Sequence, residues 1–248
     1  MVNHVREHRS LLAAAEKRLL IGIAHRLPGW VTSDQLTILA LCAMGAAGAG
    51  FALSRWDVRC LWITVAALAV NWFGDSLDGT LARVRKAERP RYGFYVDHVV
   101  DVVGATVLFG GMAASPYMSP LIALAALVAY LLLSSEIFLA TAAQGVFRLS
   151  FGGIGPTELR ILLAAGAIAL MGDPHVDLGP FGRHPLFDVG GAATAAGLLG
   201  ALAASVLRNV RVLSRLEPPR QGPFFTEAAA GSTIPIYVSP NIRHSGDA

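Results

Sequence analysis

Charged residues are scarce in this chain. Only 15% of its 248 residues are Asp, Glu, Lys or Arg, whereas 54% are hydrophobic and the mean hydropathy is +0.54. An ordinary soluble domain carries about 25% charged residues, so this composition excludes that class and indicates a membrane protein. Cysteine is scarce too. Cys42 and Cys60 both lie in apolar surroundings away from any Cys/His cluster, which excludes a disulfide framework and a zinc site.

Other features are missing as well. Residues 1–10 are polar and the apolar run that follows is interrupted by charge, so we expect no cleavable signal peptide. No segment resembles an activated serine or cysteine nucleophile. The chain is weakly basic, with a net charge of +3 and a pI near 9.1, but its basic residues flank apolar segments. That distribution favours anionic lipid headgroups over nucleic acid as the partner.

What the chain does contain is a series of apolar segments, which predicts an all-α integral membrane protein with six transmembrane helices. Residues 1–31 mix apolar residues with charged clusters and predict a juxtamembrane amphipathic helix. Residues 32–213 are expected to form the six-helix domain, and residues 214–248, rich in Pro, Gly and Ser, a flexible tail. The fifth span is short for the roughly 20 residues that a full crossing needs. We expect spans at about Ser33–Ser54, Val58–Arg83, Gly93–Ser115, Ser119–Ala143, Pro156–Met171 and Val189–Leu213.

The first span has local signals at its start and along its length. Thr32 followed by Gln35 predicts a capping box that opens the helix. Gly45, Gly48 and Gly50 suit close packing against a neighbouring helix.

Four aspartates lie at the facing ends of the second and third spans. Asp75 and Asp78 are three residues apart, and Asp97 and Asp101 are four apart, so each pair lies on one helix face. We expect the two acidic rows to face each other. A carboxylate within a membrane helix costs about 2.5–3.5 kcal/mol, so packing alone is a poor explanation for four of them.

Divalent metal would relieve this cost, because hard cations such as Mg²⁺ or Mn²⁺ take oxygen ligands and neutralise the cluster. The loop between the two rows is basic, which suggests a phosphate-bearing substrate. Gly79 and Gly93, each one turn from an aspartate, would let that substrate approach the backbone closely. The basic residues of the loop are Arg83, Arg85, Lys86, Arg89 and Arg91.

The pattern Asp75-x2-Asp78-Gly79-x2-Ala82-Arg83-x9-Gly93-x3-Asp97-x3-Asp101 resembles the signature of the CDP-alcohol phosphotransferases, the class-I CDP-alcohol phosphatidyltransferase family. These are integral-membrane enzymes of phospholipid synthesis. The segment between Arg83 and Gly93 is one residue longer than the usual spacing. Because it is a polar loop, where length is tolerated, the same chemistry is expected.

The resemblance implies a role for each motif residue. Asp75, Asp78 and Asp97 would ligate two Mg²⁺ or Mn²⁺ ions, and Asp101 would be the general base and also touch the second ion. Gly79 and Arg83 would hold the CDP portion of the donor. An acceptor alcohol would attack the phosphorus that bears the donor's alcohol group, and CMP would leave. CDP-diacylglycerol as donor and a homodimeric assembly are implied by the family as well.

Further polar residues lie outside the motif. Glu158 and Arg160 follow a helix start at Pro156, and the family's layout makes them candidates for the acceptor site, although an ordinary helix entry would explain them equally well. Glu136 is another intramembrane carboxylate, which either functions or forms a hydrogen bond between helices. His98 is turned about 100 degrees from Asp97 on the helix, which favours an interhelical histidine over a metal ligand.

Positive charge predicts the orientation. With a cytoplasmic amino terminus and six spans, 17 of the 20 basic residues fall on the cytoplasmic side and three, Arg55, Arg59 and Arg183, on the outside. This is the positive-inside pattern. It predicts a multi-pass plasma-membrane protein with both termini in the cytoplasm and the aspartates near the cytoplasmic face.

Two other functions are open on the residues alone. A membrane aromatic prenyltransferase also binds diphosphate through metal, but its two acidic motifs are usually far apart in sequence. A divalent-cation transporter could use paired intramembrane carboxylates, but this function leaves Gly79, Arg83 and Gly93 unexplained. Release of CMP from a CDP-alcohol would distinguish the three activities.

Overall fold

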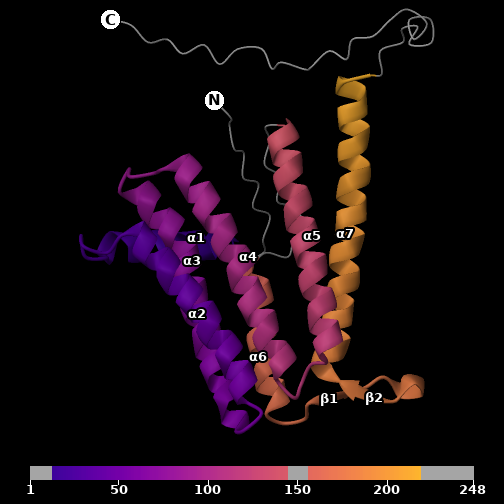
Figure 1. The fold of residues 1–248 in the computed structure, drawn as a ribbon. Coiled ribbons are helices and arrows are strands. Elements are labelled where there is room, and N and C mark those ends of the chain that lie inside the picture. The colour runs from indigo at the N-terminus through magenta and orange to yellow at the C-terminus, as the bar shows by residue number, and fades with distance from the viewer. Residues whose placement is uncertain (1–12, 145–155, 219–248) are drawn as a thin grey trace, which may run out of the picture.

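The computed structural model describes residues 13–144 and 156–218, which form seven helices and one β-hairpin (Figure 1). The hairpin joins the last two helices and consists of β1 (His175–Asp177), the 3₁₀ turn Gly179–Phe181 and β2 (Arg183–Pro185). The all-α architecture predicted from the sequence is confirmed. The helices are α1 (Ala13–Arg26), α2 (Ser33–Leu53), α3 (Leu61–Val84, preceded by a 3₁₀ turn at Val58–Cys60), α4 (Pro90–Ala114), α5 (Pro120–Gln144), α6 (Pro156–Leu170) and α7 (Leu186–Leu216).

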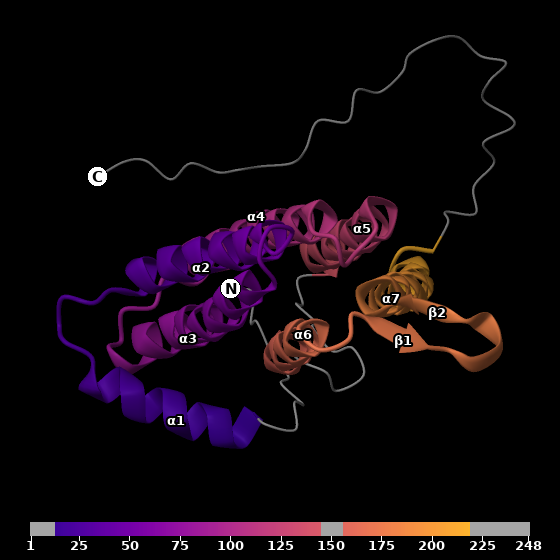
Figure 2. The same ribbon diagram turned by 90° about the horizontal axis from the view of Figure 1, so that it is seen from below.

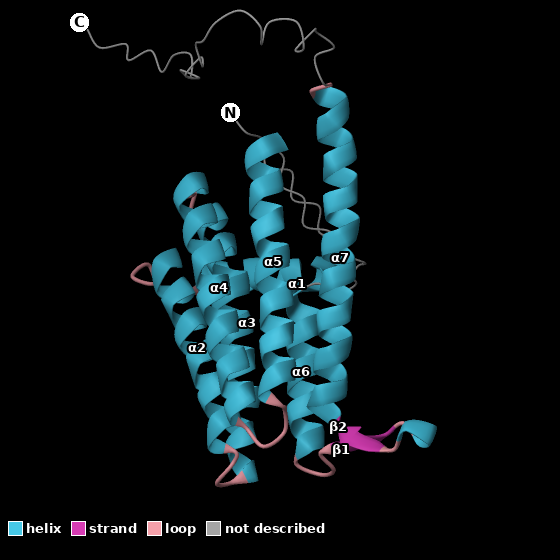
Figure 3. Cartoon of the chain, turned by 45° about the vertical axis from the view of Figure 1, so that its right-hand side comes forward, coloured by secondary structure: helices cyan, strands magenta, loops and turns pink. Residues whose placement is uncertain are grey.

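Five of these helices, α2, α3, α4, α5 and α7, are long and apolar enough to cross a membrane. They run side by side, as the side view in Figure 3 shows. Leu139, Leu162 and Leu207 on the outer faces of α5, α6 and α7 are exposed, as expected for side chains that contact lipid. The described residues therefore form a multi-pass membrane protein.

The two remaining helices depart from a full crossing. α6 has 15 residues, which at 1.5 Å per residue is about 22 Å, less than the roughly 30 Å of the hydrocarbon region. This agrees with the short fifth span predicted from the sequence. α1 runs across the other helices instead of alongside them (Figures 1 and 2) and packs on α3 through the buried Leu20 and Ala24. This is the placement expected of a juxtamembrane helix.

Several helix boundaries follow local sequence signals. The predicted capping box is present, since Thr32 accepts a hydrogen bond from the Gln35 backbone and the Gln35 side chain accepts one from the Thr32 N–H. α4, α5 and α6 each begin at a proline, which fits the first turn because no backbone N–H is needed there. α7 continues to Leu216, past the predicted end at Leu213. Residues 1–12, residues 145–155 with Arg148, and most of the predicted tail, from residue 219 on, lie outside the described residues.

Small residues bring α2 against α4. A Cβ on Gly48 would lie 2.6 Å from the Val107 carbonyl oxygen, and one on Gly111 would overlap the Gly48 carbonyl. Two of the three glycines singled out in the sequence, Gly48 and Gly50, make such close approaches. Gly45 has nothing within 4 Å of its Cβ position, so the packing role expected for it is wrong.

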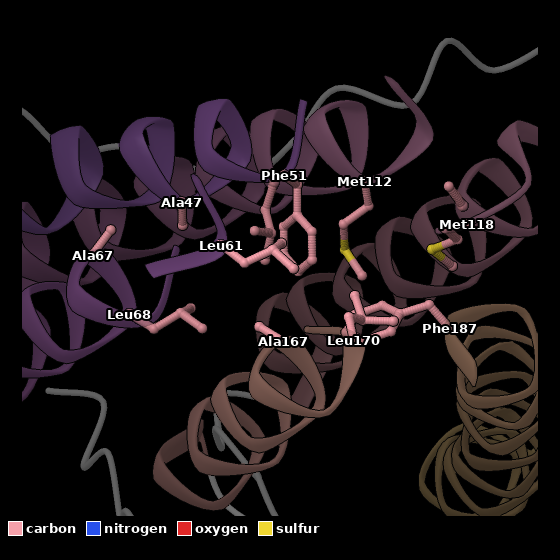
Figure 4. Packing of buried hydrophobic residues seen from close by; sticks show 12 residues of the cluster. Ala47, Phe51, Leu61, Ala67, Leu68, Met112, Met118, Ala167, Leu170 and Phe187 are labelled. Atoms are coloured by element: carbon pink, nitrogen blue, oxygen red, sulfur yellow. The ribbon is translucent and has the colours of Figure 1, made fainter. Parts of the chain in front are cut away.

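The main hydrophobic core lies at the hairpin end of the bundle. There the ends of α2, α4 and α6 meet the starts of α3 and α7, as the close-up in Figure 4 shows. Phe51 and Phe187 pack edge to face with ring centroids 5.4 Å apart. From this end the helices splay apart towards the other membrane face (Figure 1). The chain thus has one tightly packed end and one open end.

The close contact between Gly111 and Gly48 predicts that alanine substitutions at positions 110 and 111 differ strongly in their effect on stability. Gly111→Ala should lower the free energy of unfolding by about 1–3 kcal/mol, because the added methyl group overlaps backbone that has little room to move. Gly110→Ala is the matched control, since nothing lies within 4 Å of its Cβ position. Thermal unfolding in detergent measures both. Equal unfolding temperatures for the two variants would contradict the close packing of α2 on α4.

Candidate active site

Three of the four motif aspartates converge from two helices. Carboxylate oxygens of Asp75 on α3 and of Asp97 and Asp101 on α4 all lie within 4.8 Å of one another. Asp75 and Asp97 are half-buried and Asp101 is exposed. They face each other because α3 and α4 run antiparallel from a short connection, so rows near the end of one helix and the start of the next lie at the same height. The cluster lies in the open half of the bundle.

Asp78 belongs to the same helix face but has different partners. Its Oδ2 accepts a hydrogen bond of 2.6 Å from the Thr37 hydroxyl on α2, and its Oδ1 accepts one from the Gly79 N–H. The Ser33 hydroxyl also donates to the Asp78 carbonyl at 2.9 Å. Asp78 therefore lies between the cluster and the start of α2.

Arg160 on α6 is the counter-ion of the cluster. Its Nη2 lies 2.6 Å from Asp75 Oδ2, and its Nε donates to Asn71 Oδ1 at 2.7 Å. Asn71 is held in turn by donating to the Ala40 carbonyl at 2.9 Å. The Arg160 Nη1 is buried and has no hydrogen-bond partner among the described residues. One nitrogen of this guanidinium thus has no hydrogen-bond partner among these residues.

The two motif glycines leave open backbone beside the carboxylates. Among the described residues, only the Arg83 guanidinium, at 3.9 Å, approaches the Cβ position of Gly79, and none lies within 4 Å of that of Gly93. Arg83 itself donates to the Thr80 hydroxyl at 3.2 Å and so folds back along α3. A substrate could reach this backbone without displacing protein atoms.

Comparison with known proteins agrees with this arrangement. The sequence profile of the CDP-alcohol phosphatidyltransferases matches residues 30–207, well over half of the chain. The chain belongs to the CDP-alcohol phosphatidyltransferase family. A search of curated proteins returned no match. The resemblance found in the motif is therefore confirmed, and with it membership of a phosphotransferase family that acts on CDP-alcohols and is generally dependent on divalent metal.

In this member of the family, part of the basic loop has a structural role that the sequence did not reveal. Arg85 donates to the carbonyls of Leu27, Pro28 and Val31, and so fastens the α1–α2 connection to the end of α3. Arg89 pairs with Asp34, which raises the pKa of the guanidinium, and stacks over the Tyr92 ring at 4.0 Å. These two arginines are thus engaged with protein groups.

Sequence reasoning also missed Glu16. Its Oε1 accepts three hydrogen bonds, from Trp72 Nε1 at 2.7 Å, Ser76 Oγ at 3.1 Å and Thr157 Oγ1 at 2.9 Å. One carboxylate oxygen of α1 therefore ties α3 to the first turn of α6, on either side of the Asp75–Arg160 pair. A signal was present, because Glu16 is spaced four residues from Leu20 and eight from Ala24 and so shares the buried face of α1.

An apolar cavity of about 480 Å³ adjoins this network between α1, α3 and α6. Glu16, Thr157 and Arg160 lie at its polar part. The apolar lining comes from Leu19, Val65, Leu68, Ala69, Trp72, Ile161 and Ala164. An arginine next to an apolar slot suits an amphipathic ligand with an anionic head.

Three further polar residues were considered from the sequence: Glu158, Glu136 and His98. Glu158 is half-buried in the first turn of α6. Glu136 Oε1 accepts a 2.7 Å hydrogen bond from Asn209, which joins α5 to α7. The His98 ring lies 4.2 Å from Phe94 and 4.8 Å from Phe138 of α5, centroid to centroid, so it packs between helices as predicted.

The three hydrogen bonds to Glu16 predict that its role in stability depends on accepting hydrogen bonds more than on its negative charge. Glu16→Leu leaves three partly buried donors without their partner and should cost about 1–3 kcal/mol or more of unfolding free energy. Glu16→Gln keeps a carbonyl oxygen at the same place and should retain most of the stability. Unfolding temperatures in detergent decide between them. A Gln variant as unstable as the Leu variant would show that charge matters instead.

Proposed function

We propose that this protein transfers a phosphatidyl group from CDP-diacylglycerol to an acceptor alcohol, with release of CMP, in phospholipid synthesis. The observation that carries the proposal is the convergence of Asp75, Asp97 and Asp101 within the family-matched part of the chain. The family match favours this activity over the prenyltransferase and transporter considered from the sequence. We also propose a cytoplasmic position for the site and both termini, in a homodimer in the plasma membrane.

The carboxylate cluster fits a divalent metal. Mg²⁺ binds oxygens at about 2.0–2.1 Å, so two ligands on opposite sides of the ion are about 4.2 Å apart, and oxygens already within 4.8 Å need little movement. We propose two Mg²⁺ or Mn²⁺ ions held by Asp75, Asp78, Asp97 and Asp101. When bound, such ions polarise phosphoryl oxygens and stabilise charge that develops on them.

Asp101 is the best placed general base. It is the most exposed carboxylate of the cluster and lies on α4, away from the Arg160 ion pair. Its carboxylate takes the proton of the acceptor hydroxyl as the oxygen attacks the phosphorus. The bond from that phosphorus to the CMP oxygen breaks, and CMP leaves with the electron pair. Gly79 and Arg83 bind the CDP portion.

Glu158 and Arg160 belong to the proposed acceptor site. The buried Arg160 Nη1 lacks a protein partner among the described residues, and a buried guanidinium donor without one is costly. This favours an acceptor that carries an anionic group, such as a phosphate, in addition to its hydroxyl. A phosphate that binds Arg160 would hold the acceptor next to Asp75 and its neighbours.

The apolar cavity supports a lipid-linked donor. Its side chains from α3 and α6 offer a slot of about 480 Å³ that begins at Arg160, and a soluble CDP-alcohol would leave this slot unused. An acyl chain of CDP-diacylglycerol would fill it and gain about 0.8 kcal/mol per buried CH₂. With an acyl chain in this cavity, the diphosphate of the donor would lie next to the aspartate cluster.

The activity is tested with purified protein, Mg²⁺, CDP-diacylglycerol and a panel of acceptor alcohols. CMP release that depends on an acceptor, with the lipid product identified by its mass, is expected. Acceptor-independent or absent CMP release with every acceptor, from protein that is folded and binds Mn²⁺, would remove the proposal.

Asp101→Asn is expected to lower turnover by about 10²–10⁴-fold, because it removes the base but keeps an oxygen ligand. Mn²⁺ binding, followed by electron paramagnetic resonance, should be largely retained. Asp97→Ala is the comparison on the same helix, and because it removes the oxygen ligand altogether it should lose both turnover and Mn²⁺ binding. Undiminished CMP release by Asp101→Asn would exclude its role as base.

Ala164→Trp is expected to raise the KM for CDP-diacylglycerol, because the indole fills the slot between α3 and α6. A short-chain donor should be used almost as well as by the unchanged protein. Ala165→Trp is the control, since this neighbouring side chain is exposed and does not line the cavity. If both donors were affected equally, the slot would not be the acyl site.

A further inference from the structure

The β-hairpin between α6 and α7 has no part in the site described above. Its strands are three residues long and pair from His175↔Pro185 to Asp177↔Arg183. Most of its residues are exposed. A two-stranded hairpin is marginally stable at best in water unless something packs on it. Within the described residues no further strand extends this sheet, so its support must come from elsewhere.

The polar groups of the hairpin are satisfied locally. Asp173 accepts hydrogen bonds from Arg183 Nη2 at 2.7 and 3.0 Å and from the His175 N–H at 3.0 Å, and its pKa is lowered, chiefly by that backbone N–H and then by the arginine. His184 Nε2 lies 2.7 Å from the Phe181 carbonyl oxygen. One backbone bond, from Leu186 N to the Pro174 oxygen, ties the base of the hairpin to the start of α7. Polar contacts therefore do not dock the hairpin on the bundle.

The tip of the hairpin is apolar and uncovered. Phe181 is 79% exposed, and Leu178 beside it is 38% exposed. The hairpin projects sideways from the bundle, across the helix axes and level with the helix ends (Figures 2 and 3). Trp56, 76% exposed, lies in the α2–α3 connection at the same end, where Phe51 of α2 packs on Phe187 of α7. Exposed aromatic residues at the ends of spans are typical of the membrane–water interface.

We propose that residues 173–185 form an interfacial hairpin that lies on the lipid surface at the membrane face opposite the aspartates, with Phe181 and Leu178 inserted at the headgroup boundary. Three observations favour lipid as the occupant: the tip is apolar and exposed, the hairpin runs across the helix axes (Figures 2 and 3), and it lies at the same end of the bundle as the exposed Trp56. Since Arg183 is paired with Asp173, insertion does not require anionic lipid.

An anchor at this point would fix the height of α7. α7 begins at Leu186, directly after the hairpin, and its 31 residues span about 46 Å, more than the roughly 30 Å hydrocarbon region. With its start held at one interface, the surplus length emerges at the face that carries the aspartates. Arg208, Arg211 and Arg215 lie in this surplus.

Spin labelling of the full-length protein in nanodiscs tests the proposal. In a Cys42→Ala, Cys60→Ala background, a nitroxide is attached at Phe181→Cys. Leu199→Cys, exposed near the middle of α7, is the lipid reference, and Ser214→Cys, near its end, is the aqueous reference. Collision rates with oxygen, which concentrates in lipid, and with a water-soluble nickel complex report the depth of each label. Phosphatidylcholine discs are compared with discs that also contain phosphatidylglycerol.

The label at position 181 is expected to have an oxygen-to-nickel ratio between the two references and severalfold above that of position 214, in both lipid compositions. A ratio equal to that of position 214 would place the tip in water and overturn the proposal. A label shielded from both reagents would overturn it as well, because protein and not lipid would then cover the tip. Insertion of the tip only in discs that contain phosphatidylglycerol would contradict the proposal that insertion does not require anionic lipid.

Discussion

This structure depends on one constraint: several negatively charged carboxylates are held close together on membrane helices. Two carboxylates 4.8 Å apart repel by about 3 kcal/mol at an effective dielectric constant near 20, and three such carboxylates make three such pairs. Arg160 offsets part of this through its ion pair with Asp75. The repulsion that remains favours the binding of cations at the point where α3 and α4 face each other. The metal and phosphate proposed to bind here would stabilise such a site more than its own contacts do.

The division of the bundle into a packed and an open end follows from this constraint. At the hairpin end, Phe51, Leu61 and Phe187 bury apolar surface in a core to which six helices, α2 to α7, contribute. At the other end, a smaller apolar cluster joins α1, α2 and α3. Polar links add to it between α1, α3 and α6, above all the Glu16 carboxylate with its three donors. Links of this kind fix the position of Arg160 while leaving space for substrates between the helices.

Periodicity and composition predicted much of this. The spacing of the aspartates placed each row on one helix face, and the capping box at Thr32 and the short fifth span were readable from local residue types. The pairing of Arg160 with Asp75 was not, because the two residues are 85 positions apart and helix periodicity does not say which helices are neighbours. Arg85 was misjudged for a related reason. A basic loop next to acidic rows suggests a substrate, whereas four backbone carbonyls of the α1–α2 connection bind this side chain.

The short length of α6 bears on the proposed reaction. Asp75 lies about 13 Å from the end of α3 at Val84, and Arg160 lies only about 6 Å from the start of the antiparallel α6 at Pro156. α6 therefore begins roughly one turn beyond the ion pair, well below the end of α3. A sixth helix of full length would carry another turn or more past Arg160, on the side from which a diphosphate must reach the carboxylates. By starting at Pro156, α6 brings its cation to Asp75, and no helix among residues 13–144 and 156–218 extends past it over that approach.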